Sequence, residues 1–412
     1  MNFLQFAVWG AYLTSMGGFL SSIGIGSNIG WFYSIQGVVS IFMPAIIGII
    51  ADRWVEAQRL MAICHAIAAA AMGYVGYIAM NGGVTFADIF PFYTLSVAFY
   101  MPTLALSNSV SYNALEIAHL DTITAFPPIR VFGTVGFIVS MWIVDLVGVQ
   151  HSYEQFFVSA GWEVLLVAYA LTLPHCTIKK DASHKDLIDA FGLRAFKLFK
   201  EGRIATFFIF SMLLGVCLQI TNGYANTFIS SFEADEAFKG SFFVEHANIL
   251  ISLSQLSETF CILLIPFFMK HFGIKRVMLI AMFAWVLRYG FFAIGYPVMP
   301  GIIWLTLSMI VYGVAFDFFN ISGSLFIDNY TDSSIRSSAQ GLFFLFTNGL
   351  GASLGMIVAQ AVVNYATENV NGLTDGDWPW IWMVFSAYAL TLCVLFTILF
   401  KFDDKVESKT QQ

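Results

Sequence analysis

Apolar stretches long enough to cross a lipid bilayer follow one another along almost the whole chain. A helix needs about 20 mostly apolar residues to span the hydrocarbon core of a membrane. Only 11% of the 412 residues are charged, whereas soluble domains carry roughly 25%. We therefore expect an all-α membrane protein with twelve transmembrane helices. The predicted spans are residues 3–24, 29–51, 60–81, 87–112, 127–148, 156–175, 204–229, 243–269, 275–296, 300–327, 336–364 and 378–400.

Lys and Arg are distributed unevenly between the two sides of the predicted bundle. When the spans are threaded in order, all of the 19 Lys and Arg except Arg130, Lys239 and Arg288 fall in loops on the same side as both termini. Cytoplasmic loops of membrane proteins carry such an excess of basic residues. We therefore predict a multi-pass protein of the bacterial inner (cytoplasmic) membrane, with both termini in the cytoplasm.

A long polar segment divides the predicted spans into two groups of six. It contains a predicted amphipathic helix over 187–199. Each group also has a basic turn between its second and third spans, a repeat typical of secondary transporters that alternate access around a midplane site. The predicted organisation is a six-helix N-terminal half over 1–175, a cytoplasmic linker over 176–203, a six-helix C-terminal half over 204–400 and a cytoplasmic tail over 401–412.

The first of these basic turns resembles the loop motif of the major facilitator superfamily, through Gly48, Asp52, Arg53 and Arg59. The resemblance implies a 6+6 two-half architecture and a cytoplasmic gate formed by Asp52, Arg53 and Arg59, which would latch the halves through charge and helix-dipole contacts. The segment Val55–Ala57 departs from the motif, because a Gly and an early basic residue are usual there. The alternative is an ordinary basic turn on the cytoplasmic side.

Among the ionisable residues inside or at the edge of predicted spans, four stand out: Arg130, Glu258, Arg288 and Asp317. A charged side chain at the centre of a span costs about 2.5–3.5 kcal/mol or more, so such residues normally face a cavity and carry function. Two alternatives stay open. Arg288 and Asp317 could neutralise each other as a structural pair, and Arg130 could extend to the cytoplasmic interface.

Neutral polar and aromatic side chains accompany the charged ones at helical spacing. Gln219 and Asn222 share one face of their span, as do Gln255 and Glu258. Amides offer both donors and acceptors, which suits a neutral solute with many hydrogen-bonding groups. Aromatic rings such as Tyr312 and Phe316 suit a planar base or the apolar face of a sugar. The alternative is that such residues only pack helices together, and we expect that role for Asn226.

Glu258 is the candidate for proton coupling. Burial disfavours an ionised carboxylate, so a neighbouring cation or a bound substrate could shift Glu258 between its neutral and charged forms. Asp317 and Arg288 are further candidates for the same coupling. We therefore hypothesise that Glu258 binds the proton that travels with the substrate.

Six segments resemble the bacterial nucleoside:proton symporter family. They are Asn2–Gly10 (NFLQFAVWG), Tyr100–Leu104 (YMPTL), Phe126–Phe137 (FPPIRVFGTVGF), Leu218–Asn222 (LQITN), Ser254–Glu258 (SQLSE) and Phe316–Ser324 (FDFFNISGS). The resemblance implies import of nucleosides by proton symport, through alternating access to a site between the halves. The substrate-binding residues that it implies are Arg130, Thr134, Phe137, Gln219, Asn222, Gln255, Glu258, Tyr312 and Phe316.

Three other classes of function stay open at this point. A sugar or oligosaccharide:proton symporter would have the same architecture. A multi-pass enzyme is disfavoured, because the seven His are dispersed and His65 is expected to be packed within its span. A passive channel would need neither the repeat nor a titratable midplane Glu. The five Cys are scattered, so we expect no metal site and no cofactor. The expected partners are a nucleoside, protons and the lipid bilayer, with no nucleic acid, and the chain is expected to be a monomer.

Overall fold

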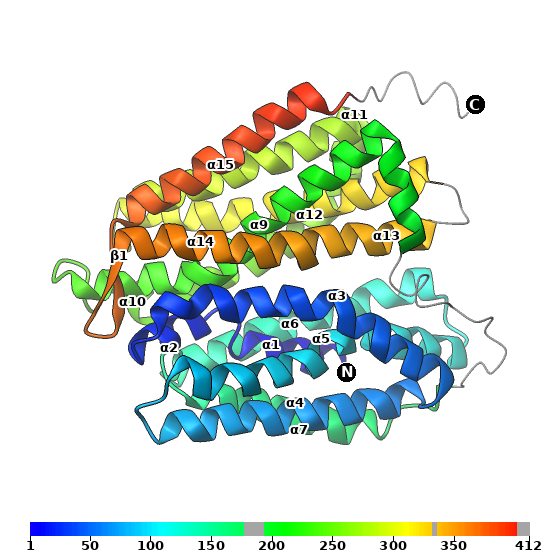
Figure 1. The fold of residues 1–412 in the computed structure, drawn as a ribbon, viewed down its shortest axis with the longest axis horizontal. Coiled ribbons are helices and arrows are strands. Elements are labelled where there is room, and N and C mark those ends of the chain that lie inside the picture. The colour runs from blue at the N-terminus through cyan, green and yellow to red at the C-terminus, as the bar shows by residue number, and fades with distance from the viewer. Residues whose placement is uncertain (177–192, 332–335, 402–412) are drawn as a thin grey trace.

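The computed structural model describes residues 1–176, 193–331 and 336–401. Two groups of roughly parallel helices lie side by side, one from each half of the chain (Figure 1). A small β-hairpin stands at one end of the bundle, which we call the hairpin end (Figure 1). The opposite end, where α7 ends and α9 begins, is called the linker end.

The first half consists of one interrupted helix followed by five longer ones. Its elements are α1 (Asn2–Gly10), α2 (Met16–Ser22), η1 (Gly26–Asn28), α3 (Ile29–Arg53), α4 (Ala57–Met80), α5 (Phe86–Ile117), α6 (Thr122–Leu146) and α7 (Glu154–Ala170).

The second half contains the hairpin and a π-helical segment. Its elements are η2 (Leu193–Lys200), α9 (Gly202–Ser231), η3 (Phe232–Ala234), α10 (Phe242–Glu245), α11 (Ala247–Ile294), α12 (Gly301–Tyr330), α13 (Arg336–Phe344), the π-helix η4 (Leu345–Gly351), α14 (Ala352–Ala366), β1 (Thr367–Val370), β2 (Leu373–Gly376) and α15 (Trp378–Leu399). The antiparallel strands β1 and β2 pair Thr367 with Gly376.

The helices account for the twelve predicted spans. Nine helical stretches among the described residues are long and apolar enough to cross a membrane. The helices α1 and α2, separated by a turn over 11–15, together form the first span. The helix α7, with 17 residues, forms another. The 48-residue helix α11 supplies two spans, because Gly273 has φ 76° and kinks it. The prediction of an all-α transmembrane fold is confirmed.

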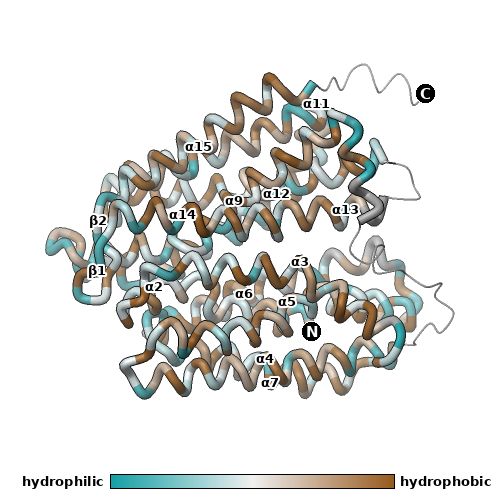
Figure 2. The backbone as a smooth tube through the Cα atoms, viewed as in Figure 1, coloured by the Kyte–Doolittle hydropathy of each residue, from teal (hydrophilic) through white to brown (hydrophobic). Residues whose placement is uncertain are grey.

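The polarity of the surface follows this arrangement. Hydrophobic residues predominate along the helices, and hydrophilic ones gather toward the two ends of the bundle (Figure 2). Large apolar side chains on the spans are exposed, as with Leu263 at 73% and Phe260 at 66%. Such exposure of apolar side chains is what a helix surface in contact with lipid requires.

The division into halves and linker stays a prediction. Residues 177–192 and 402–412 lie outside the described residues, and this includes the first part of the amphipathic helix predicted over 187–199. The described remainder of that segment forms the 3₁₀ helix η2.

Glycines allow α1 and α6 to approach each other closely within the first half. A Cβ atom at Gly136 would lie 2.0 Å from the backbone oxygen of Phe3, and one at Gly10 would lie 2.3 Å from that of Phe137. Both obstacles are backbone atoms, so relief requires the helices to separate. The contact matters for function because α6 carries the predicted site residues of the first half.

Gly136→Ala is expected to lower the thermal midpoint of the purified protein. Overpacking of this kind costs about 1–3 kcal/mol, which exceeds the roughly 1 kcal/mol that Ala gains over Gly in a helix. Gly161→Ala on α7 is the matched control, because a Cβ there meets no atom within 4 Å. Equal midpoints for the two variants would contradict the close contact.

Candidate functional site

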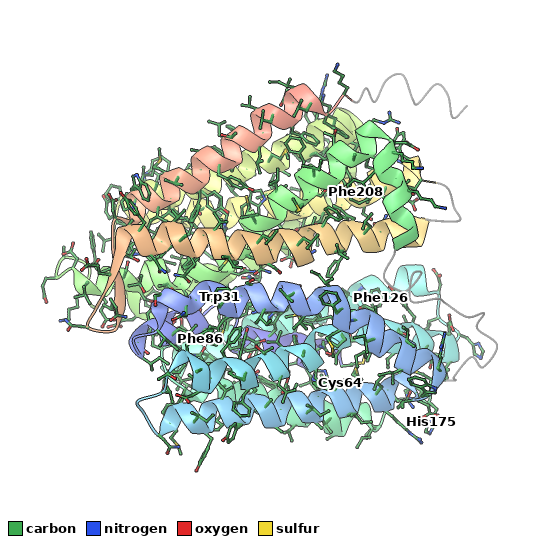
Figure 3. The ribbon with its side chains drawn as sticks, in the orientation of Figure 1. Trp31, Cys64, Phe86, Phe126, His175 and Phe208 are labelled. Atoms are coloured by element: carbon green, nitrogen blue, oxygen red, sulfur yellow. The ribbon has the colours of Figure 1, made fainter. Side chains whose placement is uncertain are left out.

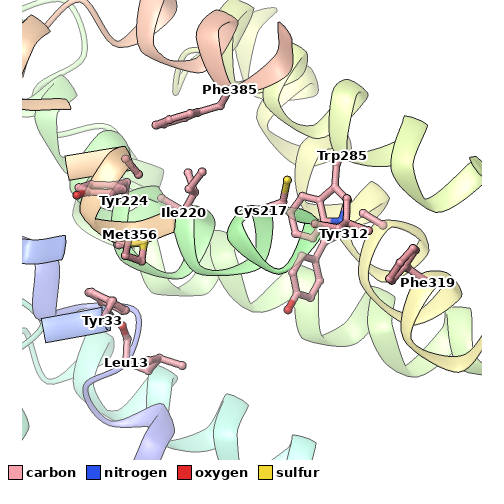
Figure 4. Close-up of a cluster of buried hydrophobic side chains, with 14 of the residues drawn as sticks. Leu13, Tyr33, Cys217, Ile220, Tyr224, Trp285, Tyr312, Phe319, Met356 and Phe385 are labelled. Carbon is pink, nitrogen blue, oxygen red and sulfur yellow. Dashed lines mark hydrogen bonds between the residues drawn. The ribbon is translucent and has the colours of Figure 1, made fainter. Parts of the chain in front are cut away.

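The predicted site residues come from four helices that meet between the halves. Arg130, Thr134 and Phe137 lie on α6, and the others lie on α9, α11 and α12. The helix α6 packs against α11 across the boundary between the halves. Tyr312 and Trp285 meet near the α9 residue Cys217 in the second half (Figure 4). The structure therefore brings residues distant in sequence to one central region.

Arg130 and Glu258 face each other from opposite halves. The Arg130 guanidinium lies over the ring of Phe6 on α1, with 4.0 Å between its Cζ atom and the ring centroid. It interacts electrostatically with Glu258, although the two form no direct ion pair within the described chain. Both side chains are half-buried. The two halves are therefore linked here by an electrostatic interaction and not by a direct ion pair.

The other two residues of α6 differ in their surroundings. Phe137 is buried, and its ring lies edge-on to Trp9 of α1 at 6.4 Å between centroids. Thr134 is half-buried, one helical turn after Arg130. The indole nitrogen of Trp9 is buried and has no hydrogen-bond partner among the described residues. Trp9 is not among the predicted site residues, although it belongs to the Asn2–Gly10 segment that resembles the symporter family.

The second half contributes amides with unpaired oxygen atoms. The Oε1 atoms of Gln219 and Gln255 are buried and have no hydrogen-bond partner in the described part of the protein. Asn222, one turn after Gln219 on α9, is half-buried. More than about 90% of buried polar groups in proteins are paired. Unpaired acceptors at two of the predicted positions are therefore what a site for a hydrogen-bonding ligand would present.

Aromatic rings stand beside these amides on α12. The rings of Tyr312 and Phe316 are stacked, with centroids 5.8 Å apart and an interplanar angle of 13°. Phe316 lines a small pocket together with Leu218 of α9 and with Asn348 of the π-helix η4. π-Helical segments occur frequently at functional sites. The pocket therefore brings an aromatic ring of α12 and an amide of η4 to the same place beside α9.

Arg288 and Asp317 do not form the structural pair considered as an alternative. Arg288 is 2% exposed and donates from Nη1 to the Ser308 carbonyl at 2.7 Å and to Ser254 Oγ at 3.3 Å. Its Cζ atom lies 4.6 Å from the centroid of the Tyr312 ring. The Asp317 Oδ2 atom is buried without a described partner, and Asp317 interacts electrostatically with Glu258. Two carboxyl groups therefore influence each other at the site.

At the linker end, Arg59 forms an ion pair within its own half. Its Nε atom lies 3.0 Å from Glu56 Oε2, and His175 Nδ1 lies 3.1 Å from the same oxygen. His175 is at the end of the bundle opposite the hairpin (Figure 3). The hydrogen bond with His175, helped by Arg59, holds the pKa of the Glu56 carboxyl below its usual range. The side chain of Asp52 lies outside what the structure describes, so the predicted gate stays a prediction.

A network of amides joins the halves at the hairpin end. Asn226 of α9 donates to Asn248 Oδ1 at 3.0 Å and to Gln150 Oε1 at 3.3 Å. Thr14, in the turn between α1 and α2, donates to the same Asn248 oxygen at 3.0 Å. Asn226 thus serves in packing, and it does so between the halves rather than within one.

An acidic residue that is not among the predicted site residues lies in this network. Asp145 near the end of α6 is 1% exposed, and its carboxylate accepts from the Asn248 backbone N–H at 3.0 Å. The second oxygen of this carboxylate lies 2.5 Å from His246 Nδ1. His246 is the N-cap of α11. A carboxylate of the first half therefore caps a helix of the second half.

The described hydrogen bonds between the halves gather toward the hairpin end. Gln360 of α14 accepts from the Gly30 backbone N–H at 2.5 Å, Ser34 donates to the Ser353 carbonyl at 2.9 Å, and Ser21 pairs with Thr374 of β2 at 2.7 Å. Figure 4 shows Tyr33 and Leu13 of the first half beneath Tyr224 and Met356 of the second. The structure is therefore a state in which the halves are closed together at the hairpin end.

Comparison with known proteins gives full-length matches. A family described as "Nucleoside H+ symporter" matches residues 1–405. The xanthosine permease of Escherichia coli (strain K12) is 48% identical over 410 residues, covering 99% of this chain and 96% of the permease. The nucleoside permease NupG of the same organism is 46% identical over 404 residues, covering 98% and 94%.

Solved structures give the same correspondence. A crystal structure of the nucleoside transporter NupG superposes with a TM-score of 0.89 at 46% identity, covering 98% of each chain. A peptide transporter, POT, superposes with a TM-score of 0.67 at 14% identity, covering 97% of this chain and 93% of the other. The second likeness concerns the fold alone.

Proposed function

The chain belongs to the nucleoside H+ symporter family, and from this membership we propose how its residues bind a nucleoside and couple its import to a proton. It is a multi-pass membrane transporter and not an enzyme. The proposal rests on the buried, unpaired acceptors of Gln219, Gln255 and Asp317, together with the stacked rings of Tyr312 and Phe316.

The nucleoside binds between the halves. The amides of Gln219, Asn222 and Gln255 form hydrogen bonds with the ribose hydroxyls and the edge of the base, because an amide can both donate and accept. Phe137 or Phe316 stacks on the base. Thr134, which is half-buried, lines the site from the first half, and Tyr312, which stacks on Phe316, lines it from the second.

The proton binds to Glu258. When Glu258 is ionised, it attracts Arg130 of the other half and repels the Asp317 carboxylate. A proton on Glu258 removes both interactions at once. Loading with proton and nucleoside together then favours occluded states that the half-loaded protein rarely visits. Arg288, held by Ser254 and Ser308, supports the site through its contact with Tyr312.

The hairpin end faces the periplasm and both termini face the cytoplasm. This orientation rests on the basic residues of the sequence, which concentrate on the side of the termini. The state described above is then closed to the outside and accessible from the cytoplasm. Asp52, Arg53 and Arg59 form the cytoplasmic gate that closes in the opposite state.

Uptake of a panel of labelled compounds tests the function. Cells that lack their own nucleoside carriers and express this chain are expected to accumulate uridine or adenosine, and an uncoupler should abolish the accumulation. Unlabelled nucleosides should compete, because they share the ribose and the base, whereas disaccharides and free nucleobases should not. Competition by a disaccharide, or accumulation that survives the uncoupler, would contradict the proposal.

A further inference from the structure

A second pair of titratable groups is buried inside the first half. His65 on α4 and Glu163 on α7 are both fully buried, and His65 Nδ1 lies 3.9 Å from Glu163 Oε1. Neither oxygen of Glu163 has a hydrogen-bond partner among the described residues, and the same holds for His65 Nδ1. The functional proposal above uses neither residue.

Hydrogen bonds around His65 determine which of its ring nitrogens carries the proton. Thr103 Oγ1 donates to the Tyr100 carbonyl at 2.5 Å, so it can accept from Gln5 Nε2, which lies 2.8 Å away. The other end of that amide, Gln5 Oε1, is an acceptor and lies 3.0 Å from His65 Nε2. The His65 proton therefore sits on Nε2, and Nδ1 offers a lone pair toward Glu163.

Among the described residues, the groups that interact with Glu163 do not supply a charge that could balance an ionised carboxylate. The phenols of Tyr12 and Tyr100 interact electrostatically with Glu163, and both are neutral donors. Arg130 on α6 interacts with Tyr100 and Glu258 instead. A buried carboxylate without a partner is far more costly than the neutral acid. The neutral acid has an O–H group, and His65 Nδ1 faces it as an acceptor.

We propose that Glu163 and His65 form a proton-binding site within the first half, separate from Glu258, which holds one proton on the Glu163 carboxyl facing His65 Nδ1. Loading adds one proton to the Glu163 carboxylate. At 3.9 Å the O–H group is beyond hydrogen-bond distance of His65 Nδ1, and it donates to that nitrogen when the two side chains approach by about 1 Å. Unloading returns that proton to water and leaves a carboxylate facing a lone pair. The site is therefore loaded in the state described here, and unloading requires the surrounding helices to rearrange.

The site is connected to the transport site through α1. Gln5 accepts from His65, and its carbonyl accepts from the Tyr100 hydroxyl at 2.7 Å. The next residue, Phe6, carries the Arg130 guanidinium on its ring. Glu163 and His65 are thus positioning residues for Arg130. This consequence rests on the proposed function, whereas the proton site itself does not.

Infrared spectroscopy of the purified protein tests the proton site without any substrate. At neutral pH, where exposed glutamates are ionised, the wild-type protein with ¹³C-carboxyl glutamate should show the C=O band of a protonated glutamic acid. Glu163→Gln should lose that band, and Glu258→Gln should retain it. Glu154→Gln on the same helix is the matched control and should also retain it. A Glu163→Gln spectrum with the wild-type band would overturn the proposal.

Two further measurements are needed. The first applies if Glu163→Gln does not fold, and the second tests the positioning role, which rests on the proposed function. If Glu163→Gln does not fold, Glu163→Asp keeps the acid, and its C=O band should shift to the position of a protonated aspartic acid. Nucleoside exchange in Glu258→Gln should fall at alkaline pH, and adding Glu163→Gln should remove that fall. If exchange in Glu258→Gln did not depend on pH, Glu163 and His65 would not position Arg130. The infrared result alone would then decide whether the proton site exists.

Discussion

Glu258→Gln is expected to abolish uphill accumulation of nucleoside while leaving exchange across the membrane. The amide cannot bind and release a proton, so the variant has no way to draw on the proton gradient. One proton moving through about 100 mV supplies about 2.3 kcal/mol, which corresponds to roughly 50-fold accumulation. The ratio of internal to external nucleoside should therefore fall from tens to about one. Steady-state uptake and counterflow in proteoliposomes measure the two activities separately.

The matched control is Glu236→Gln, which makes the same chemical change on an exposed side chain that pairs with Lys239. It should accumulate nucleoside as the wild type does. Proton-driven accumulation that persists in Glu258→Gln would exclude Glu258 as the coupling residue. Asp317, which interacts with Glu258 and has an unpaired oxygen, would then become the candidate.

The span pattern could be predicted because apolarity along a membrane helix is a local property of the sequence. The ends of α3, for example, fall within about two residues of the predicted span 29–51. One departure comes from a feature that apolarity does not report. The first span is interrupted over 11–15, where Tyr12 is nevertheless fully buried. The turn predicted near 270–274 corresponds to the break at Gly273, whose φ of 76° and ψ of 172° separate two helices.

The amides and charges of the site were predictable by helical spacing, but their pairing was not. Spacing places Gln255 and Glu258 on one face of α11, yet it cannot show that Arg288 hydrogen-bonds to Ser308 rather than to Asp317. Glu163 carried the same signal as Glu258, an acid inside a predicted span, and could have been selected by it. His246 lies near the start of the predicted span 243–269, and its role becomes visible only through its contact with Asp145 of the other half.

Replacing Asp145 by Ala is expected to open the hairpin end. The change removes the acceptor for the Asn248 backbone N–H and for His246 at the start of α11. Loss of a helix cap costs about 1 kcal/mol, and each buried donor left unpaired costs about 1–3 kcal/mol. Because these bonds join the two halves, their loss destabilises only the state closed at the hairpin end. The ratio of open to closed molecules should therefore rise by about 10-fold or more.

Distances between spin labels at Asn81 and Lys239, two exposed positions near the hairpin end of opposite halves, would report this shift. Asp88→Asn is the matched control. Asp88 also accepts bonds at a helix start, from the Thr85 backbone and hydroxyl, but both partners belong to its own half. Its loss should leave the distance distribution unchanged, whereas Asp145→Ala should populate longer distances. If both variants gave the wild-type distribution, the carboxylate would be a local cap of α11 and the closed state would depend on the remaining bonds between the halves, such as those of Asn226 and Gln360.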